Sequence, residues 1–445
     1  MSTSRGEGTR GRIGHRVPGR GPGPGRGRGM RDVVVIGAGV AGLAAAIRLA
    51  EAGLSVEVVA KGVGATHLAA AVVDVLGYAP GRVDSPAEAL PAFVRDHPDH
   101  PYARLGPERI AEALSWFRGR VAELGYRGGL QRNLLLPSAL GVPRPTALAP
   151  ATMAEGDLRG GGRIVVVGFR ALKDLHPRLL AENLALADVP GGRVEARAAE
   201  VALDLGAADL GAVALARRME DPEVRKELLT ELEPAVADGE AVAFPAVLGL
   251  DDAPGIWAEL RGALGRPVFE VPTLPPSVPG IRLFRALRHA LRRAGGRLTM
   301  GAEVVGAETG NGRVTAVLTR TGSRAVRHAA RWFVLATGGV GGGGVGSDST
   351  GAFRERVLGL PLRFLPPEGP PFLPGYLGAH PAARVGVAVD ERMRPLGPDD
   401  APALENVVAA GATIGGAEPW REKSGEGISI ATGYAAAGTV LAEVG

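Results

Sequence analysis

The stretch "RDVVVIGAGVAGLAAAIRLAEAGLSVEVVAKG", residues 31–62, predicts a strand, a glycine turn, a helix and a second strand. The apolar run 33–36 is typical of a parallel strand that is buried on both faces. Gly37, Gly39 and Gly42 have the spacing that gives a tight turn, a close backbone approach to phosphate and a close helix–strand contact. The helix that follows points its N–H groups and positive dipole end at the phosphate. The stretch therefore predicts a nucleotide-binding βαβ unit.

The second strand of this unit lacks the acidic residue that usually holds a ribose hydroxyl. Ala60 stands at that position, and Lys61 follows it. Three explanations remain open. Backbone groups and Lys61 hold an adenosine half, or the cofactor is the mononucleotide FMN, or Lys61 replaces the carboxylate at an NADP site.

Composition limits the class of protein. The chain of 445 residues is long enough for two domains, and its 45% hydrophobic and 22% charged residues are ordinary for a soluble globular protein. No apolar run approaches the roughly 20 residues that a membrane-spanning helix needs. The absence of cysteine excludes disulfides and a cysteine-ligated iron–sulfur cluster within this chain. We expect no metal site, so redox chemistry requires an organic cofactor or a partner.

The N-terminal residues 1–29 predict a disordered Arg/Gly-rich tail. Residues 1–31 hold eight Arg and one Glu, so the rest of the chain carries a net charge of −3 although the whole chain carries +4. The folded part therefore gives no reason to expect nucleic acid. The tail is interpreted as a dispensable extension or as the result of a start at Met30; weak binding to RNA or anionic lipid is the alternative.

Three later segments indicate a flavin-binding crevice. They are "RWFVLATGG" (331–339), "NVVAAGATIGG" (406–416) and "SGEGISIATGYAAAGTVLAEV" (424–444). Strands that end at glycine, followed by a helix N-terminus, form the ligand crevice at the carboxyl edge of an open sheet. The residues expected to contact the cofactor are Gly37, Gly39, Gly42, Lys61, Gly62, Ala336, Gly338, Gly411, Gly425 and Gly427.

In this order the segments resemble flavoproteins of the glutathione-reductase and fumarate-reductase type. The resemblance implies an α/β, Rossmann-like FAD/NAD(P)-binding two-domain flavoprotein fold with an inserted mixed α/β domain. We expect a discontinuous flavin-binding domain of residues 30–76 and 281–445, and an inserted substrate or cap domain of residues 77–280.

Two further stretches, "HPYARLGPERI" (100–110) and "VPTLPPSVPGIRL" (271–283), resemble the B-subunit family of anaerobic, quinone-linked glycerol-3-phosphate dehydrogenases. The resemblance implies a flavoprotein that binds FMN, with FAD as the alternative. It also implies a larger catalytic, FAD-containing partner that oxidises glycerol 3-phosphate to dihydroxyacetone phosphate, and an iron–sulfur partner that passes electrons to membrane quinone. A protein of this family is cytoplasmic and is held at the inner face of the cytoplasmic membrane by its partners.

Two alternatives to this function stay open. One is a self-sufficient soluble FAD-dependent oxidoreductase of the fumarate-reductase or ketosteroid-dehydrogenase type. The other is a structural component of the complex that has lost its flavin.

The chain departs from the usual flavoprotein pattern at Ala412, where an Asp commonly contacts the ribityl chain or phosphate. Together with Ala60, this departure favours FMN over FAD. The chain also has Glu426 beside the expected flavin, where an acidic side chain is unfavourable near a reduced, anionic ring. Either Glu426 points outward or the flavin site is weakened.

Two residues are candidates for catalysis. His67 follows the Lys61–Gly62 turn closely, and histidine is a common general base. Arg282 follows a Pro-rich loop and could bind a phosphate or another anion. A structural histidine and an ordinary salt bridge are the alternative interpretations.

Overall fold

The predicted βαβ unit forms the centre of a seven-stranded sheet with the order β11-β2-β1-β14-β13-β12, in which β19 also pairs with β14. β1 pairs in parallel with β2 and β14, whereas β12 and β13 continue the sheet as an antiparallel ribbon. The strands are β1 (Arg31–Ile36), β2 (Val56–Ala60), β11 (Arg297–Met300), β12 (Glu303–Gly310), β13 (Arg313–Thr321), β14 (Arg324–Leu335) and β19 (Val407–Ala409).

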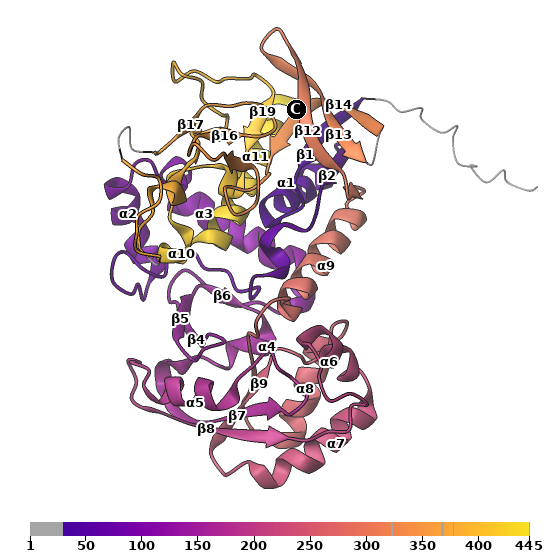
Figure 1. Cartoon of the computed structure of the whole chain (residues 1–445), viewed down its shortest axis with the longest axis vertical. Helices are drawn as coiled ribbons and strands as arrows, with labels where there is room; N and C mark the ends of the chain where they lie inside the picture. Colours follow the sequence, from indigo (N-terminus) through magenta and orange to yellow (C-terminus); the bar gives the residue numbers. More distant parts are fainter. Residues whose placement is uncertain (1–29, 322–323, 366–368, 377, 445) are drawn as a thin grey trace, which may run out of the picture.

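The computed structural model describes residues 30–321, 324–365, 369–376 and 378–444. The tail predicted to be disordered, residues 1–29, lies outside the described residues. The chain forms two lobes, and helix α9 (Val278–Arg293) leads from the lower lobe back to the upper one (Figure 1). The sheet of the βαβ unit lies in the upper lobe.

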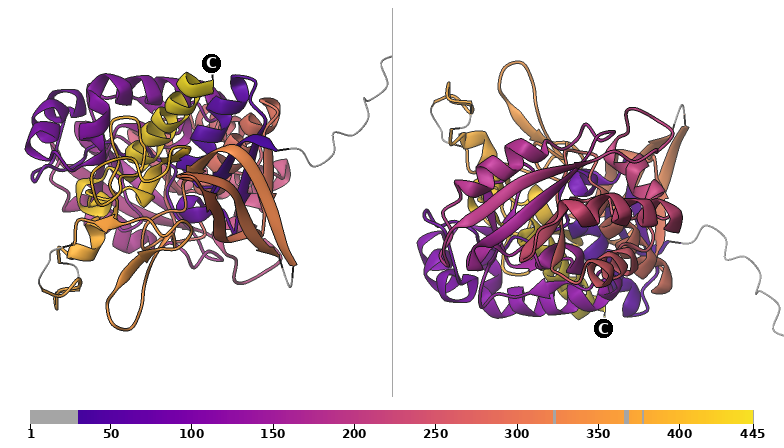
Figure 2. Two further views of the ribbon diagram at one scale, coloured as in Figure 1. Left: turned by 90° about the horizontal axis from the view of Figure 1, so that it is seen from above. Right: turned by 90° about the horizontal axis from the view of Figure 1, so that it is seen from below.

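Three helices form the layer beside this sheet. α11 (Gly425–Val444) lies between α1 (Val40–Glu51) and α3 (Pro101–Arg120), as Figure 2 shows from above. α1 carries several small side chains that are fully buried, among them Ala44, Ala45 and Ala46. α11 has the length and apolar composition of a membrane span, but 61% of its apolar window is buried inside the structure. It is packed as a core helix of this domain.

The lower lobe contains a separate sheet of four parallel strands in the order β10-β9-β7-β8. Helices pack around it and share its apolar core (Figure 1). Its elements are β7 (Gly162–Phe169), β8 (Val194–Val201), β9 (Glu240–Pro245), β10 (Val268–Val271), α5 (Pro177–Ala185), α6 (Ala212–Arg218), α7 (Pro222–Leu232) and α8 (Ala253–Leu264). The lobe is an inserted α/β unit, as the sequence predicted, and its four paired strands are all parallel.

The inserted domain is shorter than the predicted 77–280. Its core begins at Leu135, whereas α2 (Pro86–Asp96) and α3 contribute Leu90 and Phe117 to the core of the upper lobe. The apolar periodicity of a helix shows that one of its faces is buried, but not which sheet buries it. The boundary at residue 77 therefore could not be placed from the sequence pattern.

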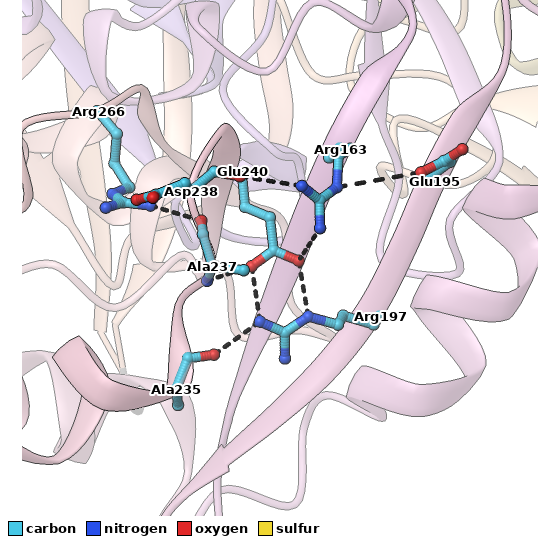
Figure 3. A network of polar contacts seen from close by, with 8 residues as sticks. All are labelled: Arg163, Glu195, Arg197, Ala235, Ala237, Asp238, Glu240 and Arg266. Atoms are coloured by element: carbon cyan, nitrogen blue, oxygen red, sulfur yellow. Dashed lines mark hydrogen bonds and ion pairs between the residues drawn. The ribbon is translucent and has the colours of Figure 1, made fainter.

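The amino ends of the inserted strands are joined by a network of ion pairs around Glu240 (Figure 3). Arg197 donates from Nε and Nη2 to the two carboxylate oxygens of Glu240, each at 2.6 Å. The backbone N–H of Ala237 donates to the same carboxylate at 2.8 Å. The hydrogen bond from Arg197 is the main cause that lowers the pKa of Glu240. The network links β8 to β9 and to the residues just before β9.

The remaining elements are short connections. They are β3 (Arg127–Gly128), β4 (Leu134–Pro137), β5 (Pro143–Thr146), β6 (Leu148–Ala149), α4 (Ala151–Ala154), β15 (Val345–Ser347), β16 (Phe353–Glu355), β17 (Leu362–Arg363), β18 (Gly386–Val387) and α10 (Pro419–Glu422).

Candidate cofactor-binding site

The carboxyl ends of β1, β2, β14 and β19 open into one cavity of about 950 Å³. Small-molecule sites measure about 300–1,000 Å³, so the cavity is large enough for an extended ligand. Eight of the residues expected to contact a cofactor line it: Gly37, Gly39, Lys61, Gly62, Ala336, Gly338, Gly411 and Gly425. Ala412, the position that lacks the usual Asp, also lines it.

The three glycines of the turn have different structural roles. A Cβ at Gly37 would overlap the carbonyl oxygen of Ala336, and a Cβ at Gly42 would overlap that of Gly37. These two glycines allow the turn, the strand and the helix to pack closely. A Cβ at Gly39, in contrast, would have no described protein atom within 4 Å. The backbone of Gly39 is therefore open to the cavity, as a phosphate cradle requires.

The N-terminus of α11 also meets the cavity. Gly425, Glu426 and Ser429 line the cavity there, and the helix dipole favours negative charge at this end. Gly427 has a packing role instead. Its N–H donates to the carbonyl oxygen of Asp74 at 2.9 Å, and a Cβ there would overlap the hydroxyl of Tyr102.

Glu426 lines the cavity, so it does not point outward, which was the first of the two expected alternatives. Burial is the main cause that raises the pKa of Glu426, to about 7, and the nearby charge of Asp74 adds to the effect. The positive charges of Arg144 and Lys423 act in the opposite direction. A carboxyl group with this pKa is protonated for part of the time near neutral pH. The site therefore accommodates Glu426 without a full negative charge beside the cofactor.

The end of β2 carries an ion pair. Lys61 Nζ lies 3.1 Å from Oε1 of Glu303, the first residue of β12, and both side chains line the cavity. Sequence reasoning did not identify Glu303, because β2 and β12 are far apart in the chain. Only the position of β12 beside β2 brings this carboxylate to the cavity.

Two arginines of the cavity were also not predicted. Arg354 and Arg356 lie on and just after β16, line the cavity and are exposed. Together with the glycine turn and the N-terminus of α11, they make the cavity suitable for an anionic ligand.

The two candidate catalytic residues lie apart from this cavity. Arg282 is buried, donates from Nε to the carbonyl oxygen of Gly249 at 2.8 Å, and forms an ion pair with Glu270. This is the structural salt bridge that was the alternative interpretation. The ring of His67 packs edge-on against Phe284, with a centroid distance of 5.2 Å. Burial is the main cause that lowers the pKa of His67.

Among the described residues, no group of three or more His, Asp or Glu side chains could hold a metal ion. The features of the cavity instead fit a flavin. It offers an open glycine turn for phosphate, a helix N-terminus for the negative charge of a reduced ring, and apolar strand ends between them.

Comparisons with known proteins agree with this geometry. Residues 32–428 match the FAD binding domain family. The probable B subunit of the anaerobic glycerol-3-phosphate dehydrogenase of Halobacterium salinarum is 37% identical over 426 residues, which cover 93% of this chain and 98% of that protein. The B subunit of the corresponding enzyme of Yersinia pseudotuberculosis is 32% identical over 425 residues, with the same two coverages.

Solved structures are more distant. The 3-ketosteroid Δ1-dehydrogenase of Sterolibacterium denitrificans is 14% identical, with a TM-score of 0.43 over 93% of this chain and 100% of that chain. A flavocytochrome c3 fumarate reductase is 11% identical, with a TM-score of 0.43 over 94% of this chain and 79% of that chain.

The fold is that of an FAD-binding flavoprotein, as predicted, and the cofactor class is a flavin. The full-length match to two B subunits is more specific than the domain match, because it includes the inserted domain. The chain therefore belongs to the FAD binding domain family and, within it, to the B-subunit family of anaerobic glycerol-3-phosphate dehydrogenases.

Proposed function

We propose that this protein is the flavoprotein component of an anaerobic glycerol-3-phosphate dehydrogenase and passes electrons from glycerol 3-phosphate oxidation toward quinone. The observation that carries the proposal is the 37% identity to a B subunit over nearly the whole of both chains. The cavity supports it, because its residues suit a flavin and the chain has no cysteine for an iron–sulfur cluster of its own.

We propose FAD as the cofactor, which revises the expectation of FMN. The support is the match of residues 32–428 to the FAD binding domain family and the size of the cavity, about 950 Å³. The cavity is lined by the glycine turn and the N-terminus of α11, and also by Ala60, Ala302 and Val305. A dinucleotide has two halves for a cavity of this size, whereas a mononucleotide would fill only part of it.

The residues of the chain have separate tasks in this proposal. The Gly39 backbone binds phosphate, and the N-terminus of α11 stabilises negative charge on the ring. Lys61 and the other cavity residues at the end of β2 hold the adenosine half. A bound flavin supplies the electron-transfer chemistry itself, and the protein positions it and excludes water. His67 and Arg282 have no direct part in this arrangement.

The partners are part of the proposal. We propose a catalytic partner with FAD and an iron–sulfur partner, which together with this chain pass electrons to membrane quinone. The chain would then be cytoplasmic and held at the inner face of the membrane through these partners. The relatives are named as B subunits of an enzyme, and this chain has no cysteine for an iron–sulfur cluster. Both facts support an enzyme in which several chains carry out the electron transfer together.

The test is reconstitution of the complex. The chain is co-expressed with its candidate catalytic and iron–sulfur partners, and reduction of a soluble quinone analogue by glycerol 3-phosphate is measured with and without it. We expect co-purification of the three chains and loss of quinone reduction when this chain is omitted. Chromatography of the heat-released cofactor from this chain separates FAD from FMN. Full glycerol 3-phosphate oxidation by this chain alone would indicate a self-sufficient oxidoreductase instead. A folded chain that cannot be loaded with flavin would indicate a structural component.

A further inference from the structure

Four charged side chains lie together at the N-terminus of α11, next to the cavity. They are Lys423 and Glu426 at the start of the helix, Arg144 on β5, and Asp74, which is placed beside the first helical turn by the hydrogen bond from the N–H of Gly427 to its carbonyl oxygen. Of the four side chains, Glu426 lines the cavity. When all four are ionised, their charges sum to zero, so the charge of Glu426 is the one that a bound ligand can change.

Opposing influences act on the carboxyl group of Glu426. Burial and the negative charge of Asp74 favour the neutral form and raise the pKa of Glu426 to about 7. Oδ1 of Asp74 is buried without a hydrogen-bond partner among the described residues. Arg144, Lys423 and the N–H groups at the start of α11 favour the charged form. Because the net result places the titration near neutral pH, one further charge in the cavity is enough to change the protonation of Glu426.

The other ionisable groups behind Glu426 keep their charge. The hydroxyls of Tyr102 and Tyr126 are fully buried, and burial raises the pKa of each, so both stay neutral. The carboxylate of Glu422 is 3.2 Å from Nε2 of His100, and it also accepts a hydrogen bond from the hydroxyl of Ser424. None of these groups is a resident of the cavity wall, so a charge in the cavity acts first on Glu426.

Further charged side chains line the cavity from β2, β12, β16 and the residue after β16: Lys61, Glu303, Arg354, Glu355 and Arg356. Lys61 and Glu303 form an ion pair with each other. Glu355 is buried and accepts hydrogen bonds from two backbone N–H groups that follow it. The two arginines add positive charge and therefore oppose proton uptake by Glu426, which limits its size but not its direction.

Reduction of a flavin brings negative charge into the cavity. Two electrons and one proton leave the ring with one negative charge, and a like charge nearby disfavours the ionised form of a carboxyl group. We propose that the carboxylate of Glu426 takes up a second proton, from solvent, when the bound flavin is reduced, and releases it when the flavin is reoxidised. The new O–H bond forms on the carboxyl group alone, and the electrons come from the oxidation of glycerol 3-phosphate proposed above. The inference rests on a bound flavin and holds for FMN and FAD alike.

The test counts protons against electrons in the flavin-loaded, full-length chain. The midpoint potential of the flavin is measured as a function of pH for wild type and Glu426→Gln. One additional proton per two electrons steepens the fall of the potential by about 30 mV per pH unit. We expect this additional slope in wild type above the pKa of about 7, and not in Glu426→Gln. At lower pH the two slopes should coincide, because Glu426 is protonated in both redox states.

Infrared difference spectra give a second measurement. At about pH 8, reduction should produce the C=O band of a protonated carboxyl group in wild type, and this band should be missing in Glu426→Gln. Glu443→Gln, at the exposed far end of α11, is the matched control and should keep both the slope and the band.

Two variants of neighbouring charges leave Glu426 in place. Lys423→Gln removes a positive charge, so the additional slope should move to higher pH. Asp74→Asn removes a negative charge, so it should move to lower pH. A purely structural role of Glu426 gives no such opposite shifts.

Equal slopes in wild type and Glu426→Gln over the whole pH range would overturn the inference, and so would a carboxyl band that persists in Glu426→Gln. If Glu426→Gln bound no flavin, Lys423→Gln would decide, because an unshifted slope in that variant contradicts the role of Glu426. A wild-type chain that cannot be loaded with flavin would refute the proposed cofactor and this inference together. Quinone reduction by the reconstituted complex does not depend on the slope, so failure of the two proposals can be distinguished.

Discussion

Arg144 donates from Nε to Oδ2 of Asp74 at 2.8 Å, and this ion pair connects β5 to the segment of chain beneath the N-terminus of α11. Asp74 is 1% exposed, and its other oxygen, Oδ1, is buried with no hydrogen-bond partner among the described residues. The carboxylate of Asp74 is therefore a buried negative charge close to Glu426. This charge contributes to the raised pKa of Glu426.

The raised pKa of Glu426 predicts a pH-dependent stability. The carboxyl group titrates at about 7 in the folded protein and near 4.5 in the unfolded chain, so the folded state binds the proton more tightly. Stability should therefore fall as the pH rises from 4.5 to 7. Glu426→Gln removes this loss of stability, and we expect the flavin-free variant to be more stable than flavin-free wild type by about 1–3 kcal/mol at pH 8. Urea unfolding at pH 8 and pH 4.5 measures the difference.

At pH 4.5 and below, the gain from Glu426→Gln should disappear. Glu443→Gln, at the exposed far end of α11, is the control and should show no such dependence on pH. An equal effect of Glu426→Gln at both pH values would contradict the assignment of the raised pKa.

Gly39→Ala should separate cofactor binding from folding. The position has φ −71° and no described neighbour within 4 Å of a Cβ, so alanine should fit the protein. The methyl group would, however, occupy the space of the phosphate. Loss of two phosphate hydrogen bonds at about 1.5–3 kcal/mol each weakens binding by two to four orders of magnitude. We expect a folded variant with unchanged circular dichroism and little bound flavin, and a stronger effect for Gly39→Val.

Gly119→Ala, in α3, is the control for Gly39→Ala, because a Cβ there also has no described neighbour within 4 Å. It should keep its flavin. Gly42→Ala should instead impair folding, since its Cβ would overlap the Gly37 carbonyl oxygen. Full flavin occupancy in Gly39→Val would show that this turn does not hold the phosphate.

Arg282→Met should reduce stability rather than remove an anion site. Arg282 Nη1 lies 2.6 Å from Oε2 of Glu270, and both side chains are buried. Removal of one partner leaves an uncompensated buried charge, which costs about 3–5 kcal/mol. Urea unfolding should show this loss, and Arg282→Met combined with Glu270→Gln should recover part of it.

Arg285→Ala, in the next turn of the same helix, breaks an exposed pair with Asp251 and should cost less than about 1 kcal/mol. If Arg282→Met kept its stability but lost electron transfer in the complex, Arg282 would have a role in anion binding after all.

His67→Ala tests the remaining catalytic candidate. Its ring packs edge-on against Phe284, and such contacts contribute about 0.5–1.5 kcal/mol. We expect a stability loss of this size, measured by urea unfolding, with unchanged flavin content and unchanged quinone reduction in the complex. A variant with normal stability and flavin content that fails to pass electrons would restore His67 as a functional residue.

The local parts of the fold were predictable from sequence. The glycine turn at 37–42, the strand ending at Leu335 and the helix beginning at Gly425 each have a pattern set by neighbouring residues. Strand and helix periods, and the backbone freedom of glycine, act over a few residues, so they can be read along the chain. The comparisons confirm the flavoprotein fold that these segments predicted.

Contacts between distant segments could not be predicted in this way. Glu303 reaches the cavity because β11 and the start of β12 lie against β2, and Glu426 is partly buried because Asp74 and Arg144 pack beside it. Arg282, chosen as an anion site from its place after a Pro-rich loop, is neutralised by Glu270. A sequence pattern gives the charge of a side chain, but its partner and its burial depend on tertiary packing.

The sequence by itself thus determined that the chain builds a nucleotide-binding sheet with a crevice at its carboxyl edge, because buried strands and glycine turns are encoded by adjacent residues. Only the tertiary structure decided which charged groups enter that crevice. Strand order and register bring together residues such as Lys61 and Glu303 that are far apart in the chain, and the free energy of those contacts arises only when the sheet has formed.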